Sequence, residues 1–203
     1  MNKNKNTLII ADGITTLKDV RQYITDVVIP DGITEIACKA FENCTLLTEI
    51  TIPDSVTKIG KFAFYKCSSL ASITIPDGVT SIGWSTFSGC SSLTSITIPD
   101  SVTKIGDFAF NGCSSLKEIV IPNSVEFIGD SAFWSCTSLT KITIPDRVIY
   151  IGDWSFEECL SLESIYIDQE KDSLDLRYAE IPKTTKVYWR GEWDKEEENE
   201  QEI

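Results

Sequence analysis

The chain has 203 residues, of which 42% are hydrophobic and 24% are charged, a balance typical of a folded domain of ordinary size. Its 18 Lys and Arg residues stand against 31 Asp and Glu residues, and the resulting net charge of −13 disfavours nucleic acid and anionic lipid as partners. Histidine is absent, which excludes His-dependent catalytic triads, His-ligated metal sites and imidazole-based pH switches.

The N-terminal segment shows no targeting signal. Its apolar stretch, Leu8-Ile9-Ile10, is shorter than the ~7–15 residues of a signal-peptide core, and no run approaches the ~20 residues of a membrane helix. We therefore expect a soluble chain, either cytosolic or secreted and recorded without its leader. Residues 8–17 echo residues 27–36 at an offset of 19, so we interpret residues 1–23 as a shortened N-terminal capping unit.

A 23-residue repeat fills residues 24–167. Proline, phenylalanine and cysteine each recur six times at this spacing, with no insertion. The recurring positions are Pro30, Pro53, Pro76, Pro99, Pro122 and Pro145; Phe41, Phe64, Phe87, Phe110, Phe133 and Phe156; and Cys44, Cys67, Cys90, Cys113, Cys136 and Cys159.

Each repeat divides into two halves. Ile73-Thr74-Ile75 alternates apolar and polar residues, which predicts a strand with one buried face, and Pro76 ends that strand because it has no N–H to donate. In the second half, apolar residues lie three to five positions apart between Val79 and Leu93, which predicts a short helical or 3₁₀ segment. Gly83 and its equivalents precede this segment, where we expect a bend.

A single repeat cannot bury its own apolar face, but stacked repeats turn each apolar position into a continuous buried row. The sequence therefore predicts a solenoid. We expect one parallel β-sheet on the concave side, with strands about 4.8 Å apart. The short helical or 3₁₀ segments and loops would lie on the convex side.

The motif Leu-x-x-Ile-x-Ile-Pro, followed by Ile-Gly-x-x-Ala-Phe-x-x-Cys-x-x-Leu at residues 105–116, resembles the BspA-type leucine-rich repeat, also called the Treponema pallidum type. It departs from the commonest leucine-rich repeats because no Asn follows the strand. The resemblance implies a horseshoe solenoid and a family mostly of surface-associated adhesion or interaction proteins in bacteria and some protists. It implies a cell-surface or secreted location, with the cytoplasm as the alternative, and supplies no catalytic residues.

The repeat pattern stops after Ile167. We expect residues 168–191 to form a C-terminal cap whose last strand lies within residues 182–189. Residues 192–203 are strongly acidic and are interpreted as a disordered, solvated tail.

Six of the seven cysteines form one row of the repeat. A spacing of 23 does not match the closely spaced pairs of Cys metal sites, so we expect reduced, buried, small apolar side chains and neither a metal nor a cofactor. Disulfides between neighbouring repeats are the alternative. Cys38 lies outside the row, at a position expected to be exposed.

Two surfaces could hold a binding site. The exposed face of the predicted strands is mostly Thr and Ser, and no aromatic cradle is apparent there. The outer face of the second half is richer in aromatic residues, which either form a contact surface or lie flat over the core. The candidate binding residues there are Phe127, Trp134, Tyr150 and Trp154 near one end, and Phe62, Tyr65 and Trp84 near the other.

These observations favour a non-catalytic interaction or adhesion module that presents a curved repeat surface to a protein or glycan partner. A structural spacer or a self-assembling solenoid unit is the alternative. A catalytic function is the least favoured hypothesis, because a regular solenoid offers grooves rather than the concave pocket that catalysis needs. Neither nucleic-acid binding nor membrane insertion is expected, and the oligomeric state stays open.

Overall fold

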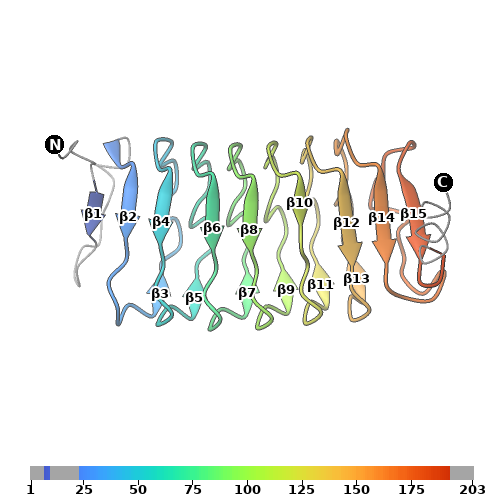
Figure 1. Cartoon of the computed structure of the whole chain (residues 1–203), viewed down its shortest axis with the longest axis horizontal. Coiled ribbons are helices and arrows are strands. Elements are labelled where there is room, and N and C mark those ends of the chain that lie inside the picture. Colours follow the sequence, from blue (N-terminus) through green and yellow to red (C-terminus); the bar gives the residue numbers. More distant parts are fainter. Residues whose placement is uncertain (1–6, 10–22, 193–203) are drawn as a thin grey trace, which may run out of the picture.

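The computed structural model describes residues 7–9 and 23–192, and shows a parallel β-solenoid in which the repeats stand side by side as coils (Figure 1). We number the coils one to six by their buried phenylalanines, from Phe41 to Phe156. The predicted solenoid is confirmed.

The strands form two parallel rows rather than the single sheet that was predicted. The first row, which we call the long-strand sheet, runs from β1 to β15, and the second, the short-strand sheet, runs from β3 to β13 (Figure 1). Ladder hydrogen bonding is interrupted between β4 and β6, between β8 and β10 and between β5 and β7, which divides the two rows into five hydrogen-bonded sheets. The long-strand sheet contains β1 (Thr7–Ile9), β2 (Asp26–Val28), β4 (Glu49–Thr51), β6 (Ser72–Thr74), β8 (Ser95–Thr97), β10 (Glu118–Ile119), β12 (Lys141–Ile144), β14 (Ser164–Ile167) and β15 (Lys186–Trp189). The short-strand sheet contains β3 (Glu35–Ile36), β5 (Lys58–Ile59), β7 (Ser81–Ile82), β9 (Lys104–Ile105), β11 (Phe127–Ile128) and β13 (Tyr150–Ile151).

The register of both strand rows follows the 23-residue period. Ile142 lies opposite Ile165 in the long-strand sheet, and Ile105 lies opposite Ile128 in the short-strand sheet. Equivalent side chains therefore stack in rows along the solenoid. The central row is a column of six buried phenylalanine rings, whose centroids are 5.3–5.8 Å apart and whose planes differ by only 2–7°. The core is thus one continuous column, and each coil is needed to cover its neighbours.

The segment after the short strand is a series of turns, and the predicted short helical or 3₁₀ stretch is wrong at this point. Its N–H groups alternate between two kinds of acceptor. The Phe41 N–H donates to the Ala63 carbonyl of the next coil (2.8 Å), whereas the Glu42 N–H donates to the Lys39 carbonyl within its own coil (3.2 Å). Left-handed backbone at Lys39 (φ 62°) turns the peptides alternately outward. A helix would have kept all of these bonds within one coil.

The recurrent glycine before this segment is confined by close packing at four of its five positions, Gly83 being the exception, and is not required by a bend. Gly129 does not have positive φ, and a Cβ placed on it would lie 2.5 Å from the Asp107 backbone nitrogen of the preceding coil. Gly152 is equally confined by Asp130. The glycine row therefore lets the backbones of successive coils approach closely.

Both ends of the long-strand sheet carry an additional strand. At one end β1 pairs with β2, and Leu8 lies opposite Val27, the offset of 19 found in the sequence. At the other end β15 pairs with β14, and the buried Trp189 covers the last coil. Most of the proposed N-terminal cap (1–23) and the acidic tail beyond residue 192 lie outside the described residues, so the division into caps, repeats and tail stays a prediction.

Candidate interaction surfaces

The outer face, as we define it, consists of five positions in each coil, which in the second coil are Lys58, Lys61, Phe62, Tyr65 and Lys66. Lys58 lies on β5 of the short-strand sheet, and the other four lie in the turn segment that follows. Because the register is constant, each position forms a row along the solenoid with a step of 23 residues.

Three of the predicted aromatic residues meet in the second and third coils. The Phe62 ring lies 5.7 Å from the Tyr65 ring in an edge-to-face arrangement, and 6.0 Å from the Trp84 ring. Trp84 is 46% exposed, whereas Phe62 and Tyr65 are half-buried. The sequence therefore grouped these three correctly, and they both cover the coil beneath them and present a surface to solvent.

Lysines lie over each ring of this cluster. The Nζ atoms of Lys39, Lys61 and Lys66 are 5.4, 5.7 and 5.2 Å from the ring centroids of Phe62, Trp84 and Tyr65, respectively. Each exposed cation–π contact of this kind contributes about 0.5–1 kcal/mol. The cluster is therefore a basic aromatic surface on a chain whose overall charge is strongly negative.

The other four predicted residues lie in the fifth and sixth coils. Phe127 and Tyr150 are direct neighbours on β11 and β13. All four are exposed, from 36% for Trp134 to 51% for Trp154. The ring contacts found within residues 23–192 include none among these four, so they form a looser group than the basic aromatic surface.

Aspartates surround this second group. Asp107, Asp130 and Asp153 occupy one row, in which the Asp153 N–H donates to the Asp130 carboxylate (3.1 Å) and the Asp130 N–H donates to the Asp107 carboxylate (3.3 Å). The Tyr150 hydroxyl also donates to Asp130, at 3.2 Å. Partial burial and the Asp130 carboxylate raise the pKa of Tyr150. This row of hydrogen-bonded aspartates, the aspartate ladder, gives this end of the outer face an acidic character.

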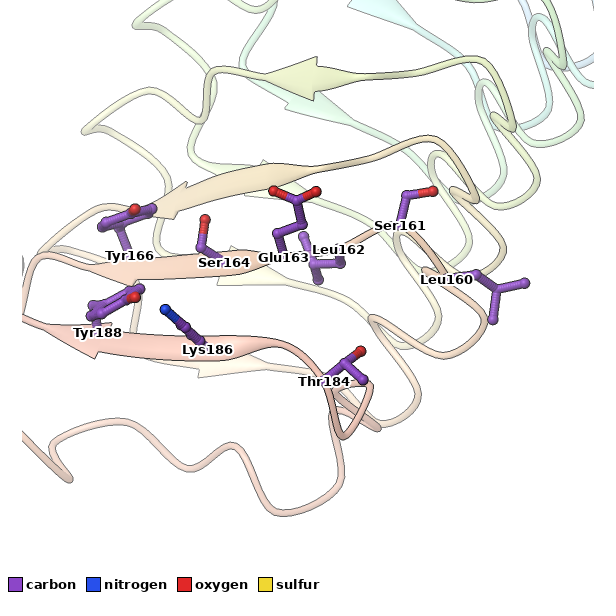
Figure 2. Close-up of a pocket in the computed structure, with 9 residues that line it drawn as sticks. All are labelled: Leu160, Ser161, Leu162, Glu163, Ser164, Tyr166, Thr184, Lys186 and Tyr188. Atoms are coloured by element: carbon purple, nitrogen blue, oxygen red, sulfur yellow. The ribbon is translucent and has the colours of Figure 1, made fainter.

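The structure adds a third surface that the sequence analysis missed. An open hollow of about 630 Å³ lies on the exposed face of β14 and β15, and Figure 2 shows its lining residues. Tyr166 and Tyr188 are stacked at its end with centroids 5.1 Å apart, and the Lys141 Nζ lies 4.3 Å from the Tyr166 ring centroid. Ser164 and Lys186 lie beside them (Figure 2). The expectation that this face has no aromatic cradle is therefore wrong at its C-terminal end.

The two tyrosines of this hollow are visible in the sequence, but Tyr188 could not be aligned with the repeat. Tyr188 belongs to the final strand, which follows an irregular segment and so does not fall on the 23-residue period. The pairing of β14 with β15 places it directly opposite Tyr166.

The six row cysteines are buried, and the thiols of the five from Cys67 to Cys159 donate hydrogen bonds to carbonyl oxygens of the preceding coil. The Cys90 Sγ lies 3.1 Å from the Phe64 carbonyl oxygen of the preceding coil, and the arrangement recurs along the row. Burial raises the pKa values of Cys90 and Cys159 to about 12, so these thiols are not nucleophiles at neutral pH. Cys38 is exposed, as predicted.

Within the part of the chain that the structure describes, no group of three or more Cys, Asp or Glu side chains is arranged to hold a metal ion. Over the same residues, no helix has the length and apolar character needed to cross a bilayer.

Comparison with known proteins agrees with this architecture. The family model described as the BspA type Leucine rich repeat region matches in six copies, over residues 20–139 and 80–178. A comparison with curated proteins finds no match.

Solved structures of bacterial leucine-rich repeat proteins resemble the chain. The T. pallidum leucine-rich repeat protein is 40% identical, with a TM-score of 0.66 over 69% of this chain and 68% of its own. A leucine-rich cell surface protein from Faecalibacterium prausnitzii is 25% identical, with a TM-score of 0.54 over 84% of this chain and 62% of its own. A leucine-rich repeat protein from Bacteroides ovatus is 27% identical, with a TM-score of 0.50 over 81% of this chain and 60% of its own.

The chain thus spans less than two thirds of the length of the F. prausnitzii and B. ovatus proteins. The family match covers most of the present chain, and the relatives are repeat proteins of a kind that is typically non-catalytic and generally mediates protein interactions. The strand rows, the phenylalanine column and the cysteine row all follow the same 23-residue register, in agreement with this match. The chain belongs to the BspA-type leucine-rich repeat family.

Proposed function

We propose that this chain is a non-catalytic adhesion module that binds a protein partner through the aromatic residues of its outer face. The observation that carries the proposal is the basic aromatic surface, in which Phe62, Tyr65 and Trp84 are in contact while lysines lie over each ring. Large aromatic and cationic side chains that are accessible and held in place are the residues that dominate binding energy in protein interfaces.

We also propose a location at the cell surface. The support is the F. prausnitzii relative, which is a cell surface protein, together with the family resemblance. Adhesion to host proteins would use the repeat surface directly, without a catalytic step.

The experiment is capture of extracellular-matrix proteins on immobilised protein, with the double variants Phe62→Ala/Trp84→Ala and Trp134→Ala/Trp154→Ala alongside the original chain. We expect at least one double variant to lose most of the captured partner while its circular dichroism spectrum stays unchanged. Ser72→Ala/Ser95→Ala, on the long-strand sheet, is the matched control. Capture that is equal for all three variants would contradict the proposal.

A glycan partner is a second candidate, and the hollow beside Tyr166 and Tyr188 favours it. Aromatic rings next to hydroxyl and charged groups are the combination that holds a sugar ring, and Ser161, Ser164 and Thr184 supply hydroxyls here. Tyr188→Ala should abolish glycan binding in titrations with oligosaccharides and leave capture of a protein partner unchanged. Glycan binding that survives this substitution would exclude the hollow.

A further inference from the structure

The outer face carries opposite charges in its second and sixth coils, in the same five positions of the repeat. The first coil holds Glu35, Lys39 and Glu42 at these positions, and Glu35 pairs with Lys58 of the second coil (2.8 Å). In the second coil these positions hold three lysines and two aromatic residues, Lys58, Lys61, Phe62, Tyr65 and Lys66. In the sixth coil they hold three acids and two aromatic residues, Tyr150, Asp153, Trp154, Glu157 and Glu158. The second coil therefore carries three positive charges where the sixth carries three negative ones.

The coils between them are nearly neutral. The five positions of the third coil hold no charge, those of the fourth hold Lys104 and Asp107, and those of the fifth hold Asp130 alone. The charge therefore changes sign along the face, and the change is centred on the fourth coil. Four steps of about 4.8 Å place the two charged ends roughly 19 Å apart.

We propose that the outer face binds the outer face of a second copy of this chain, antiparallel and centred on the fourth coil. The proposal rests on the proposed function, since it names a partner for the same face. A two-fold axis lying across the solenoid in the contact plane reverses the order of the coils but keeps each repeat position opposite its own equivalent. The second coil then faces the sixth, the third faces the fifth, and the fourth faces itself, which places Lys104 and Asp107 each opposite its own equivalent at the two-fold axis.

The outer pair of coils matches in charge. Lys61 comes to lie opposite Asp153, and Lys66 opposite Glu158, because each pair is separated by four repeats. The two-fold axis repeats both pairs, so four complementary pairs form in one dimer. All four side chains are exposed or half-buried in the single chain and so are accessible to a partner. Such complementary charges fix the register of an interface and suppress other alignments.

The inner pair of coils matches in size. Each large ring of the third or fifth coil meets a smaller side chain at the equivalent position of the other coil, so the rings can interdigitate. The opposed pairs are Ser81 with Phe127, Trp84 with Asp130, and Ser88 with Trp134. At the remaining positions, Ser85 faces Ser131 and Gly89 faces Ser135, and all four are small. Ser85, Ser88 and Ser131 are already buried in the single chain, so the contact at these positions is made by the larger side chains around them. Contact would cover Trp84, Phe127 and Trp134, which are 46%, 39% and 36% exposed in the single chain.

The experiment exploits this symmetry with two charge-reversal variants, Lys61→Glu/Lys66→Glu and Asp153→Lys/Glu158→Lys. Sedimentation velocity at low salt and micromolar concentration should show a dimer for the original chain. Each variant alone opposes like charges at all four pairs, so its dissociation constant should rise at least tenfold. An equimolar mixture restores opposite charges at every pair, and we expect it to form a heterodimer.

Lys117→Glu/Lys141→Glu is the control, because it makes the same charge change on the long-strand side and should leave the dimer intact. An original chain that is monomeric throughout the micromolar range, or a mixture that stays monomeric while both variants are folded by circular dichroism, would overturn the proposal. The function proposed above is tested separately: a monomer that still loses its matrix partner on Trp134→Ala/Trp154→Ala rejects the dimer alone. A dimer that captures no matrix protein rejects adhesion alone.

Discussion

The Cys90 thiol donates to the Phe64 carbonyl of the preceding coil with an Sγ to O distance of 3.1 Å, and the same oxygen accepts the Cys67 N–H at 3.1 Å. One carbonyl thus uses both of its lone pairs, one within its coil and one between coils. The equivalent thiol bonds of Cys67, Cys113, Cys136 and Cys159 are 3.1–3.3 Å long. The cysteine row is therefore a hydrogen-bonded ladder between coils as well as a packing element.

Replacing one rung of that ladder should destabilise the fold. Cys113→Ala leaves the Phe87 carbonyl without its second donor and opens a small cavity, so we expect the free energy of unfolding to fall by about 1–3 kcal/mol. Cys113→Ser retains a donor and should cost less than the alanine variant. Urea unfolding followed by circular dichroism measures both. Equal losses for alanine and serine would show that only packing matters at this position.

Alkaline pH should weaken the fold through the same row. Burial raises the pKa of Cys90 and Cys159 from 9.0 to about 12, and also raises the pKa of Cys113 and Cys136. Because the unfolded chain releases these protons at lower pH than the folded chain, the stabilisation is complete below pH 9.0 and is lost as pH rises towards 12. We expect the urea midpoint, measured under reducing conditions, to fall steadily over that window.

The control for this prediction is Cys113→Ser/Cys136→Ser, which lacks two of the titrating thiols and should lose less stability over the same pH range. Cys38→Ser should follow the original chain, since Cys38 is exposed. If the double serine variant has the same alkaline slope as the original chain, the tyrosines and lysines account for the loss instead.

The glycine row should tolerate substitution according to local space. Gly129→Ala places a Cβ 2.5 Å from the Asp107 nitrogen and 2.7 Å from the Gly106 carbonyl carbon, and both of these are backbone atoms that must move. A loss of about 3 kcal/mol or more is expected, as for severe overpacking. Gly83→Ala is the matched control, because its nearest neighbour is the Thr86 side-chain oxygen at 3.4 Å. Thermal unfolding of the two variants compares them directly, and similar melting temperatures would contradict the packing explanation.

The aspartate ladder should be more stable with one charge removed. Asp130→Asn keeps an oxygen that can accept from the Asp153 N–H and the Tyr150 hydroxyl, but removes repulsion from its two neighbours in the row. We expect a gain of about 0.5 kcal/mol at low salt that shrinks as ionic strength rises. Asp130→Ala loses the acceptor and should be less stable than either form. A salt-independent loss for Asp130→Asn would show that the carboxylate charge itself is required.

The period of 23 was sufficient to predict the solenoid, the buried rows and the long strands, because register makes each apolar position repeat along one axis. It was insufficient for the turn segment. Val79, Ile82 and Phe87 have a spacing that fits a helix, yet the chain there uses left-handed residues, two per coil, such as Lys39 and Asn43. Only some of these positions hold Gly or Asn, so the usual sequence signal for left-handed backbone is diluted.

The candidate surfaces were predicted to different extents. Phe62, Tyr65 and Trp84 lie close together because their spacing is fixed by the repeat itself. Tyr188 could not be placed, because its partner Tyr166 becomes known only when the irregular segment between β14 and β15 is folded. The charged residues near each aromatic group were visible in the sequence. That they lie on the same surface as the aromatic residues became known only from the arrangement of the rows in the structure.

The phenylalanine column joins coils that are interchangeable in cross-section, since Phe87 stacks on Phe110 in nearly the same way as Phe110 stacks on Phe133. A gene that loses or duplicates one whole 23-residue segment would therefore still encode a foldable chain, with every phenylalanine ring stacked on the next. Such a length variant would move its charged ends closer together or further apart by one coil. The number of repeats would then set the distance between the charged coils. Chains of equal length would recognise one another through the proposed contact, and chains of unequal length would not.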